Sequence, residues 1–350
     1  MAKSRNSKLK VGIVGLGIGS LHAQGYSKCP EVEILAICDP VEEKVNRVAA
    51  QYGVQFTFTD YREMLRLKDL DAVSVCTPNY LHARVTIDCL RAGKHVICEK
   101  PLATTPKEGE AMVKTAMETG KLLMTAFNNR FRGDTQTLKR FIENGDLGEI
   151  YFAKCGWIRR KGIPGFGSWF TQKSKAGGGP LLDIGVHVLD MTLWLMGSPK
   201  ATSVSGATYA KFGPFGLGRG TWGCAEESGT FDVEDMGVGF IRLETGATIM
   251  LEASWASHIK ADRYYASLMG TKGGADIDPF CIYTDINGAE VDITPNFPHV
   301  SGHEMEIRHF VDCLVKGTKC ISTGEDGLEA IRILDAIYRS AETGKEVRLK

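Results

Sequence analysis

The chain has 350 residues, of which 42 are Lys or Arg and 42 are Asp or Glu, so its formal net charge at neutral pH is zero. A balanced charge supplies no strong field for nucleic acid or an anionic membrane surface, and polyanion binding is therefore disfavoured. With 43% hydrophobic and 24% charged residues, the composition excludes disordered and fibrous classes and allows two globular domains.

The ten cysteines are spread along the chain without a CxxC pair. The first ten residues, MAKSRNSKLK, have no apolar segment behind the basic residues, and no stretch approaches eighteen consecutive apolar residues. We expect a soluble cytoplasmic protein without a disulfide framework. Cys38, Cys76 and Cys98 lie in or at the end of apolar runs, which indicates small buried hydrophobes rather than metal or redox groups.

Residues 1–127 alternate short apolar runs with helical periods. Several runs are apolar at nearly every position, as in strands buried on both faces, and strands separated by helices imply parallel crossovers. Glycines 53, 93 and 120 follow helical stretches, where a left-handed C-cap is needed. This half predicts an α/β domain with a doubly wound parallel sheet. The expected strands are 9–15, 32–38, 72–76, 95–100 and 122–127, and the expected helices are 21–28, 42–52, 80–92 and 106–120.

Residues 128–350 have a different character and predict a second, α+β domain. Strands dominate residues 201–294, and turn residues at 244–246 and 287–288 mark hairpins, so we expect a large, mostly antiparallel open sheet. The other expected elements are a strand at 149–159 and helices at 135–143, 181–196, 304–315 and 325–341.

The first strand runs into a glycine-rich turn with the sequence VGIVGLGIGS, residues 11–20. Gly15 permits the tight turn, Gly17 lets the backbone approach a pyrophosphate, and Ser20 stands as a small residue in the third glycine position. Ile18 and the additional Gly19 lie between them at the start of the helix. Because the motif joins the first strand to the first helix, it predicts a Rossmann dinucleotide-binding domain rather than a purely structural turn.

Asp39 ends the second strand about twenty residues beyond these glycines. A carboxylate there can accept hydrogen bonds from the adenine ribose, and it would repel the 2′-phosphate of NADP. Pro40 and Val41 offer no arginine to pair with that phosphate, so the sequence favours NAD. A turn or N-cap role for Asp39 is the alternative.

Three stretches resemble the Gfo/Idh/MocA family, named after glucose-fructose oxidoreductase, inositol dehydrogenase and the rhizopine-catabolism oxidoreductases. The likeness spans both halves, and the family tolerates Ser at the position of Ser20. The stretches are the nucleotide loop with Gly17, Ser20 and His22; AGKHVICEKPLA with Glu99, Lys100 and Pro101; and GGGPLLDIGVHVLDMTLWLMG with Asp183 and His187.

This resemblance implies that Lys100, Asp183 and His187 line the site where nicotinamide meets a sugar or polyol. Lys100 follows an apolar strand at the carboxyl edge of the sheet, where it can stabilise negative charge on a reacting oxygen. In the family the peptide before Pro101 is often cis. A solvated surface lysine is the alternative.

Asp183 and His187 are four residues apart on an expected helix that has Pro180 in its first turn, so both side chains project from one face. An imidazole titrates near neutral pH and suits removal of a hydroxyl proton, while Asp183 can orient the substrate. A core histidine and an i, i+4 metal pair are the alternatives, but the metal pair has no convincing further ligand, and we expect no metal. Asp190 continues this face as a structural residue.

Further candidates lie at the ends of other strands or before the triple glycine. Half of the loop residues fit simple turns equally well, and residues 159–161 fit an exposed basic loop. The resemblance implies cofactor contacts at Thr77, Pro78, Asn79, His82, Glu99, Lys100 and Asn128, and a substrate contact at Arg130. The other expected substrate contacts are Lys100, Arg159 and Trp169 with Asp183 and His187.

The sequence thus predicts an NAD-dependent dehydrogenase that reversibly oxidises a secondary hydroxyl of a sugar, glycoside or cyclic polyol, with C3 of a sugar as the specific hypothesis. One alternative is a glycosidase or lyase that requires NAD for transient oxidation followed by elimination. The other is a non-catalytic NAD-binding sensor or co-regulator. By resemblance alone, we expect a homo-oligomer formed through the exposed sheet.

Overall fold

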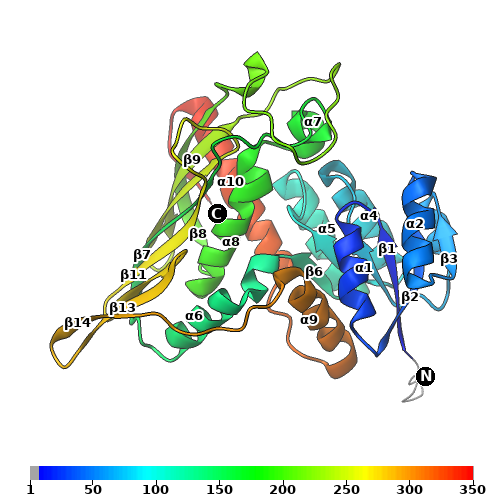
Figure 1. Ribbon diagram of the computed structural model, residues 1–350, viewed down its shortest axis with the longest axis horizontal. Coiled ribbons are helices and arrows are strands. Elements are labelled where there is room, and N and C mark those ends of the chain that lie inside the picture. The colour runs from blue at the N-terminus through cyan, green and yellow to red at the C-terminus, as the bar shows by residue number, and fades with distance from the viewer. Residues whose placement is uncertain (1–7, 350) are drawn as a thin grey trace. The chain divides into compact units, whose positions relative to one another are not determined.

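The computed structural model describes residues 8–349, which form two compact units (Figure 1). Unit 1 contains the described part of Met1–Ala103 together with Lys107–Phe131 and Val300–Leu328. Unit 2 contains Thr104–Pro106, Arg132–His299 and the described part of Glu329–Lys350. No helix within residues 8–349 is long and apolar enough to cross a membrane.

Unit 1 is built on a six-stranded parallel sheet with the strand order β3-β2-β1-β4-β5-β6. The order reverses between β1 and β4, so the carboxyl ends of these strands define the switch point where doubly wound sheets bind ligands. The expected doubly wound sheet is confirmed, and the short β3 is an additional edge strand. The strands are β1 (Leu9–Val14), β2 (Val32–Cys38), β3 (Phe56–Phe58), β4 (Ala72–Val75), β5 (His95–Glu99) and β6 (Leu123–Ala126).

Helices cover both faces of this sheet (Figure 1). Gly53, Gly93 and Gly120 follow helices and have φ angles of 64°, 76° and 63°, as the left-handed C-cap requires. The helices are α1 (Gly19–Ser27), α2 (Glu42–Tyr52), α3 (Tyr61–Met64), α4 (Asn79–Arg91), α5 (Pro106–Thr119) and α9 (Gly302–Lys316), with the 3₁₀ turn η1 (Asn128–Phe131) after β6.

The position of α9 corrects the expected division of the chain at residue 128. Val300–Leu328, which contains α9, belongs to unit 1. Gly25 of α1 allows this helix to approach closely: a Cβ at Gly25 would lie 2.9 Å from the side chain of Ile307. The segment after α9 joins the end of the sheet, since the Thr125 N–H donates to the Ser322 carbonyl at 3.0 Å. Long-range packing therefore returns part of the second half of the chain to the nucleotide-binding unit.

Unit 2 contains a nine-stranded sheet with the order β14-β13-β12-β11-β7-β10-β9-β8-β15. The neighbouring strands are antiparallel except for β7 and β10, which pair in parallel, so the mostly antiparallel sheet is confirmed as a mixed one. The strands are β7 (Ile150–Ile158), β8 (Ala201–Tyr209), β9 (Met236–Leu243), β10 (Thr248–Ser254), β11 (Arg263–Gly270), β12 (Gly273–Ile277), β13 (Phe280–Ile286), β14 (Ala289–Ile293) and β15 (Val347–Arg348).

The helices of unit 2 pack on one face of this sheet (Figure 1). The burial pattern of β10 shows the resulting alternation. Ile249 and Leu251 are buried, whereas Met250 between them is 47% exposed on the opposite face. Close packing also requires Gly239, where a Cβ would lie 2.5 Å from Ile337 of α10. The helices are α6 (Gly133–Glu143), α7 (Lys173–Ala176), α8 (Val186–Leu195) and α10 (Gly324–Thr343), which belongs to unit 2 from Glu329 onward. The shorter turns are η2 (Trp169–Thr171), η3 (Leu181–Gly185) and η4 (Gly213–Phe215).

Candidate active site

The glycine-rich turn after β1 has the geometry of a dinucleotide loop. Gly15 has a φ of 89°, and a Cβ there would lie 2.4 Å from the carbonyl oxygen of Cys76, so only glycine fits. A Cβ at Gly17 would meet no atom within 4 Å. The space beside Gly17 is thus open to a ligand, while Gly15 is required by the turn itself.

The residue that permits close packing of α1 on the sheet is Gly19, not Ser20. A Cβ at Gly19 would lie 2.9 Å from Ile13 of β1, within the range that real side chains avoid. The Ser20 side chain instead donates to the Gly17 carbonyl at 2.8 Å and is partly exposed. The sequence correctly predicts that a small residue packs against β1, but this residue is Gly19 and not Ser20, the next position.

Asp39 is 5% exposed and links the glycine loop to the start of α2. Its Oδ2 accepts a hydrogen bond from the Leu16 N–H at 2.8 Å, and its Oδ1 accepts one from the Val41 N–H at 2.9 Å. The turn role considered for Asp39 is therefore present. Each carboxylate oxygen has a second lone pair, so these bonds are compatible with acceptance from a ribose hydroxyl.

We expect the double variant Asp39→Ser/Pro40→Arg to shift cofactor preference from NAD toward NADP. Serine removes the negative charge and keeps an acceptor near Leu16, and arginine offers a bidentate partner for the 2′-phosphate. The measurement is the ratio of kcat/KM for the two cofactors, with Pro40→Arg alone as the control. An unchanged ratio in the double variant would show that Asp39 does not read the ribose.

Two polar atoms near the carboxyl edge of the unit 1 sheet are buried without a hydrogen-bond partner within the described chain: Thr77 Oγ1 and Asn128 Oδ1. Thr77 follows β4, and Asn128 follows β6. Buried polar atoms normally have partners, so two unsatisfied ones at the ends of these strands fit a bound polar cofactor. The residues present therefore fit NAD.

His82 lies behind this edge and joins two loops. Its Nδ1 lies 2.8 Å from the carbonyl oxygen of Pro101, and its Nε2 lies 2.8 Å from that of Thr77. Burial lowers the pKa of His82, although the two carbonyl contacts oppose this effect. His82 is fully engaged between the loops, so we assign it the role of positioning them; Pro78 and Asn79 begin α4 between these contacts.

The end of β5 presents Lys100 beside a buried ion pair. Glu99 Oε1 lies 3.1 Å from His22 Nε2, and Glu99 Oε2 accepts the Lys100 N–H at 3.1 Å. Burial raises the pKa of Glu99, but the hydrogen bond and charge of His22 outweigh it, so the pKa is lowered. The Lys100–Pro101 peptide is cis, as the resemblance implies. Glu99 thus orients the backbone that carries Lys100.

A second imidazole and carboxylate, which the sequence did not reveal, continue this network from α9. His303 Nδ1 lies 3.1 Å from Glu306 Oε1, and His303 Nε2 lies 3.3 Å from Asn128 Nδ2. Burial raises the pKa of Glu306 despite the hydrogen bond with His303. The pKa of Glu99 is lowered and that of Glu306 is raised, so Glu99 is the more acidic of the two carboxyl groups. Only the folding of α9 onto unit 1 brings these groups together.

In unit 2, Asp183 and His187 lie where a π-helical turn, η3, meets α8. The expected single α-helix over 181–196 is therefore wrong for its first turn. A buried carboxylate that is distant in sequence holds the start of this turn: Glu234 accepts the N–H groups of Gly179 at 2.9 Å and Leu181 at 3.2 Å. Such π turns frequently occur at functional sites.

Glu234 is held in turn by Tyr338 of α10, whose hydroxyl donates to Oε1 at 2.7 Å. Burial raises the pKa of Glu234, while these hydrogen bonds oppose the shift. Asp183 is fixed separately, because its Oδ2 accepts the indole N–H of the buried Trp255 at 2.9 Å. Sequence reasoning missed Glu234, Trp255 and Tyr338, since no local motif marks them.

Aromatic and cationic side chains gather around Trp157, a neighbour of His187 within unit 2. The ring centroids of His187 and Trp157 are 6.0 Å apart, and Tyr264 meets Trp157 edge-on at 5.3 Å. The guanidinium of Arg159 lies 4.9 Å from the Trp157 ring centroid. Trp157 is thus the common neighbour of the predicted base and of Arg159, the predicted substrate residue.

Comparison with known proteins decides the family. Residues 9–127 match the family model described as "Oxidoreductase family, NAD-binding Rossmann fold", and residues 139–349 match its "C-terminal alpha/beta domain". The chain belongs to the Gfo/Idh/MocA oxidoreductase family. It is an NAD-binding oxidoreductase of the class that acts on CH–OH groups.

Similar proteins in this family include characterised dehydrogenases. The chain is 37% identical to D-glucoside 3-dehydrogenase of Escherichia coli (strain K12), over 98% of both chains. It is 28% identical to scyllo-inositol 2-dehydrogenase (NAD(+)) of Bacillus subtilis (strain 168), over 98% of this chain and 96% of the relative. The structure of a levoglucosan dehydrogenase in complex with NADH superposes with a TM-score of 0.87, at 26% identity, over 98% and 100% of the two chains.

Arg130, which the sequence predicts as a substrate contact, is buried in unit 1. It is 2% exposed, and its Nη1 contacts the Ile321 carbonyl and lies 3.2 Å from Asp326 Oδ2. These partners come from the segment that follows α9. The burial supports a structural role for Arg130, in place of the substrate contact expected from the sequence.

Trp169 lies in an aromatic cluster of unit 2. Its ring stacks on Phe170 with centroids 3.7 Å apart, and Phe170 meets Trp222 edge-on at 4.9 Å. Asp190 is 1% exposed on α8, in accord with a structural role. The substrate role of Trp169 stays a prediction, because its ring is already stacked within the chain.

Proposed function

We propose that this Gfo/Idh/MocA oxidoreductase uses NAD to oxidise the C3 hydroxyl of a hexopyranose glycoside reversibly to a ketone. The observation that carries the proposal is the arrangement of Asp183 and His187 beside Trp157 and Arg159 in unit 2. The 37% identity to a D-glucoside 3-dehydrogenase over 98% of both chains supports a glycoside rather than a cyclic polyol as the substrate.

In this proposal, His187 is the base that takes the hydroxyl proton. Its Nδ1 is buried, which leaves Nε2 as the atom that receives the proton. Asp183 is held by the Trp255 indole through one carboxylate oxygen, and the other oxygen can accept a hydrogen bond from a neighbouring sugar hydroxyl. Binding the alcohol in this way orients its C–H bond for hydride transfer.

NAD, when bound, supplies the acceptor for the hydride that leaves the sugar carbon. Gly15, Gly17 and Asp39 would hold its pyrophosphate and adenine ribose, and Thr77 and Asn128 offer the buried polar atoms described above. Lys100 would donate a hydrogen bond to the reacting oxygen and stabilise the negative charge that develops there.

Trp157 and Arg159 would recognise the sugar itself. An indole ring suits the C–H face of a pyranose, and a guanidinium offers several donors to adjacent hydroxyls. Because Arg159 lies over the Trp157 ring, the two side chains hold one another in place. The pair thus offers an apolar face and hydrogen-bond donors on the same side of unit 2.

The test is incubation of the purified protein with NAD and methyl glucosides, levoglucosan, free glucose and inositols. We expect NADH absorbance to rise with the glucosides, and a 3-keto sugar to be identified by nuclear magnetic resonance. The matched control is the 3-deoxy glucoside, which keeps every other hydroxyl and yields no NADH. Turnover of inositols alone would contradict the glycoside assignment.

The same experiment separates the alternative activities. An aryl glucoside that releases its phenol without net NADH would show transient oxidation and elimination, in contradiction to the proposal. Absence of turnover with every compound, in protein that binds NAD, would favour the sensor. The presence of an imidazole and a carboxylate at η3 and α8 supports catalysis over sensing.

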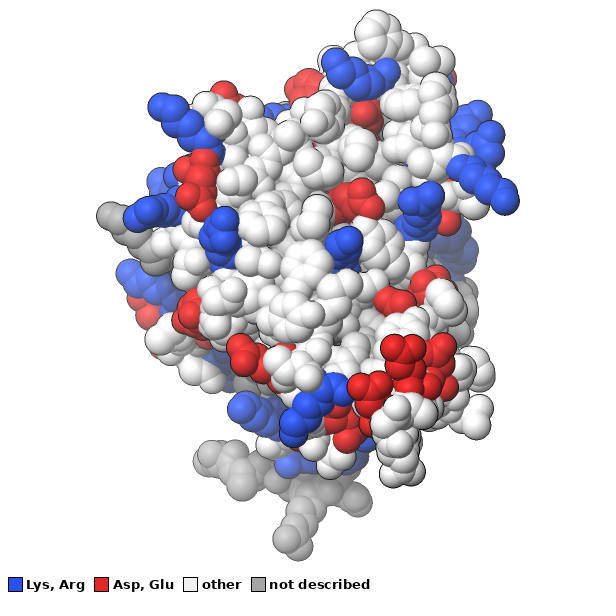
Figure 2. Space-filling view, turned by 90° about the vertical axis from the view of Figure 1, so that its left-hand side faces the viewer, with Lys and Arg blue, Asp and Glu red and all other residues white. Residues whose placement is uncertain are grey.

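We also propose that the chain forms a homo-oligomer through the open face of the nine-stranded sheet. This face is largely uncharged between single acidic and basic groups (Figure 2), and Met250 is exposed there. Sedimentation velocity of the wild type and Met250→Lys would test it, since a central charge should favour the monomer.

A reducing compartment such as the cytoplasm would keep the ten cysteines, all free thiols here, reduced.

A further inference from the structure

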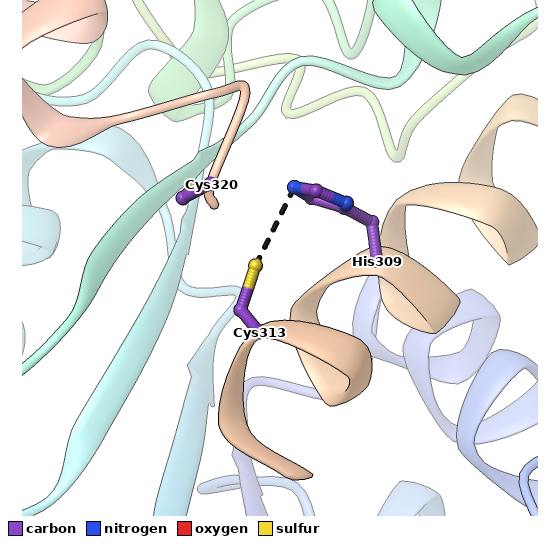
Figure 3. A group of neighbouring side chains, drawn as sticks. All are labelled: His309, Cys313 and Cys320. Carbon is purple, nitrogen blue, oxygen red and sulfur yellow. Dashed lines mark hydrogen bonds between the residues drawn. The ribbon is translucent and has the colours of Figure 1, made fainter. Parts of the chain in front are cut away.

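Three side chains with soft ligand atoms converge at the end of α9, and none of them belongs to the residues that we assign to NAD or sugar. His309 and Cys313 are one helical turn apart and point toward one another, and Cys320 lies on the segment that follows (Figure 3). The ligand atoms of all three lie within 4.8 Å of one another. Gly317, with a φ of 71°, ends the helix and turns the chain so that Cys320 returns to it.

We propose that His309, Cys313 and Cys320 form a binding site for Zn²⁺. Two thiolates and one imidazole are the donor set that this ion prefers, and a water molecule can complete the tetrahedron. Zn–S and Zn–N bonds of about 2.3 and 2.0–2.1 Å at the tetrahedral angle place sulfur and nitrogen roughly 3.5 Å apart. The observed distance from Cys313 Sγ to His309 Nε2 is 3.4 Å. This edge of the tetrahedron is therefore already formed.

The hydrogen bonds around the cluster identify the ligand atom of His309. The Ile321 N–H donates to His309 Nε2 at 3.1 Å, so this nitrogen carries the ring's single in-plane lone pair, and Zn²⁺ would take the place of the Ile321 N–H on it. Cys313 and Cys320 would bind the ion as thiolates, so Zn²⁺ takes the place of their protons.

The site has a local structural consequence in unit 1. The segment that carries Cys320 also holds Ser322, whose hydroxyl donates to the Thr125 carbonyl at 2.6 Å, at the end of β6. A metal ion bound by α9 and by this segment would fasten the helix to the edge of the parallel sheet. Because an ion that binds only the folded state stabilises it, Zn²⁺ should raise the melting temperature.

The experiment uses the full chain, reduced and freed of metal by a chelator, and then titrated with Zn²⁺ or with Co²⁺ as a spectroscopic substitute. We expect one ion per chain, and a thiolate-to-cobalt charge-transfer absorption that an oxygen and nitrogen site would not produce. Cys313→Ser and Cys320→Ser should each weaken Zn²⁺ binding by roughly 100-fold or more. This loss exceeds the one expected when a residue that only hydrogen-bonds to a metal ligand is replaced. His309→Gln should weaken it while both thiolate contributions to the cobalt spectrum remain.

Cys224→Ser is the matched control, because this exposed thiol of unit 2 lies outside the cluster and its loss should leave binding unchanged. Circular dichroism of each variant without metal shows whether the fold is retained, and the cobalt spectrum of a folded single variant should retain one thiolate contribution. Zn²⁺ binding that survives in Cys313→Ser and Cys320→Ser would overturn the proposal. A reduced wild type that binds no Zn²⁺ would also overturn it. This includes a protein whose Cys313 and Cys320 form a disulfide on oxidation but bind no Zn²⁺ when reduced.

Discussion

Replacement of His187 by Asn should lower kcat for sugar oxidation by about 10² to 10⁴, the contribution typical of a positioned general base. The wild-type rate should rise with pH through the neutral range, because the imidazole accepts the hydroxyl proton only in its unprotonated form. In the variant this limb should disappear. Measurement of kcat between pH 5.5 and 9, from about one unit below to about 2.5 units above the ordinary imidazole pKa of roughly 6.5, tests both effects.

His299→Asn is the matched control for this experiment, because His299 is an exposed histidine of unit 2. It should keep the wild-type rate and pH profile. A His187→Asn protein that retains the pH limb would identify another base, and Lys100 would be the first residue to examine. A change in KM alone would assign His187 to substrate binding.

Lys100→Met should lower kcat by about 10² to 10³ while NAD binds within a few-fold of the wild-type affinity. The first effect follows from the loss of one donor directed at developing negative charge. The second follows from the position of the pyrophosphate and ribose residues, Gly15, Gly17 and Asp39, in other loops. Methionine nearly preserves the length of the side chain, so the substitution removes mainly the charge and the hydrogen bonds.

Calorimetric titration of NAD and steady-state turnover on the same preparation separate these two effects. Lys107→Met, an exposed lysine at the start of α5, is the matched control and should change neither quantity. Parallel loss of NAD binding and turnover would give Lys100 a cofactor or folding role. Retention of both would remove it from the mechanism.

Local chemistry alone determined much of unit 1. Strands that are apolar at nearly every position can only be buried on both faces, and glycines at helix ends adopt the left-handed backbone that other residues avoid. Gly15 marks the dinucleotide turn because that turn needs a backbone conformation that favours glycine. Asp39 is recognised by its position at the end of β2, about twenty residues after the glycines. These signals depend on residues within one strand, turn or helix, so they are legible without the fold.

The tertiary structure decided the features that depend on contacts between residues distant in sequence. From more than fifty residues away, Glu234 accepts the N–H groups at the start of the π-helical turn that carries Asp183. Gly19, rather than Ser20, meets β1, and Arg130 turns inward to a segment that α9 brings back to unit 1. The parallel pairing of β7 with β10 is likewise invisible in either strand alone.

The convergence of His309, Cys313 and Cys320 shows the same division. The spacing of His309 and Cys313 places them on one face of a helix, and the sequence by itself determines that much. Cys320 joins them only because Gly317 reverses the chain and Ser322 hydrogen-bonds to the end of β6. Metal ligands must lie close together in space, and the distance between Cys320 and the helix depends on the packing of the whole unit.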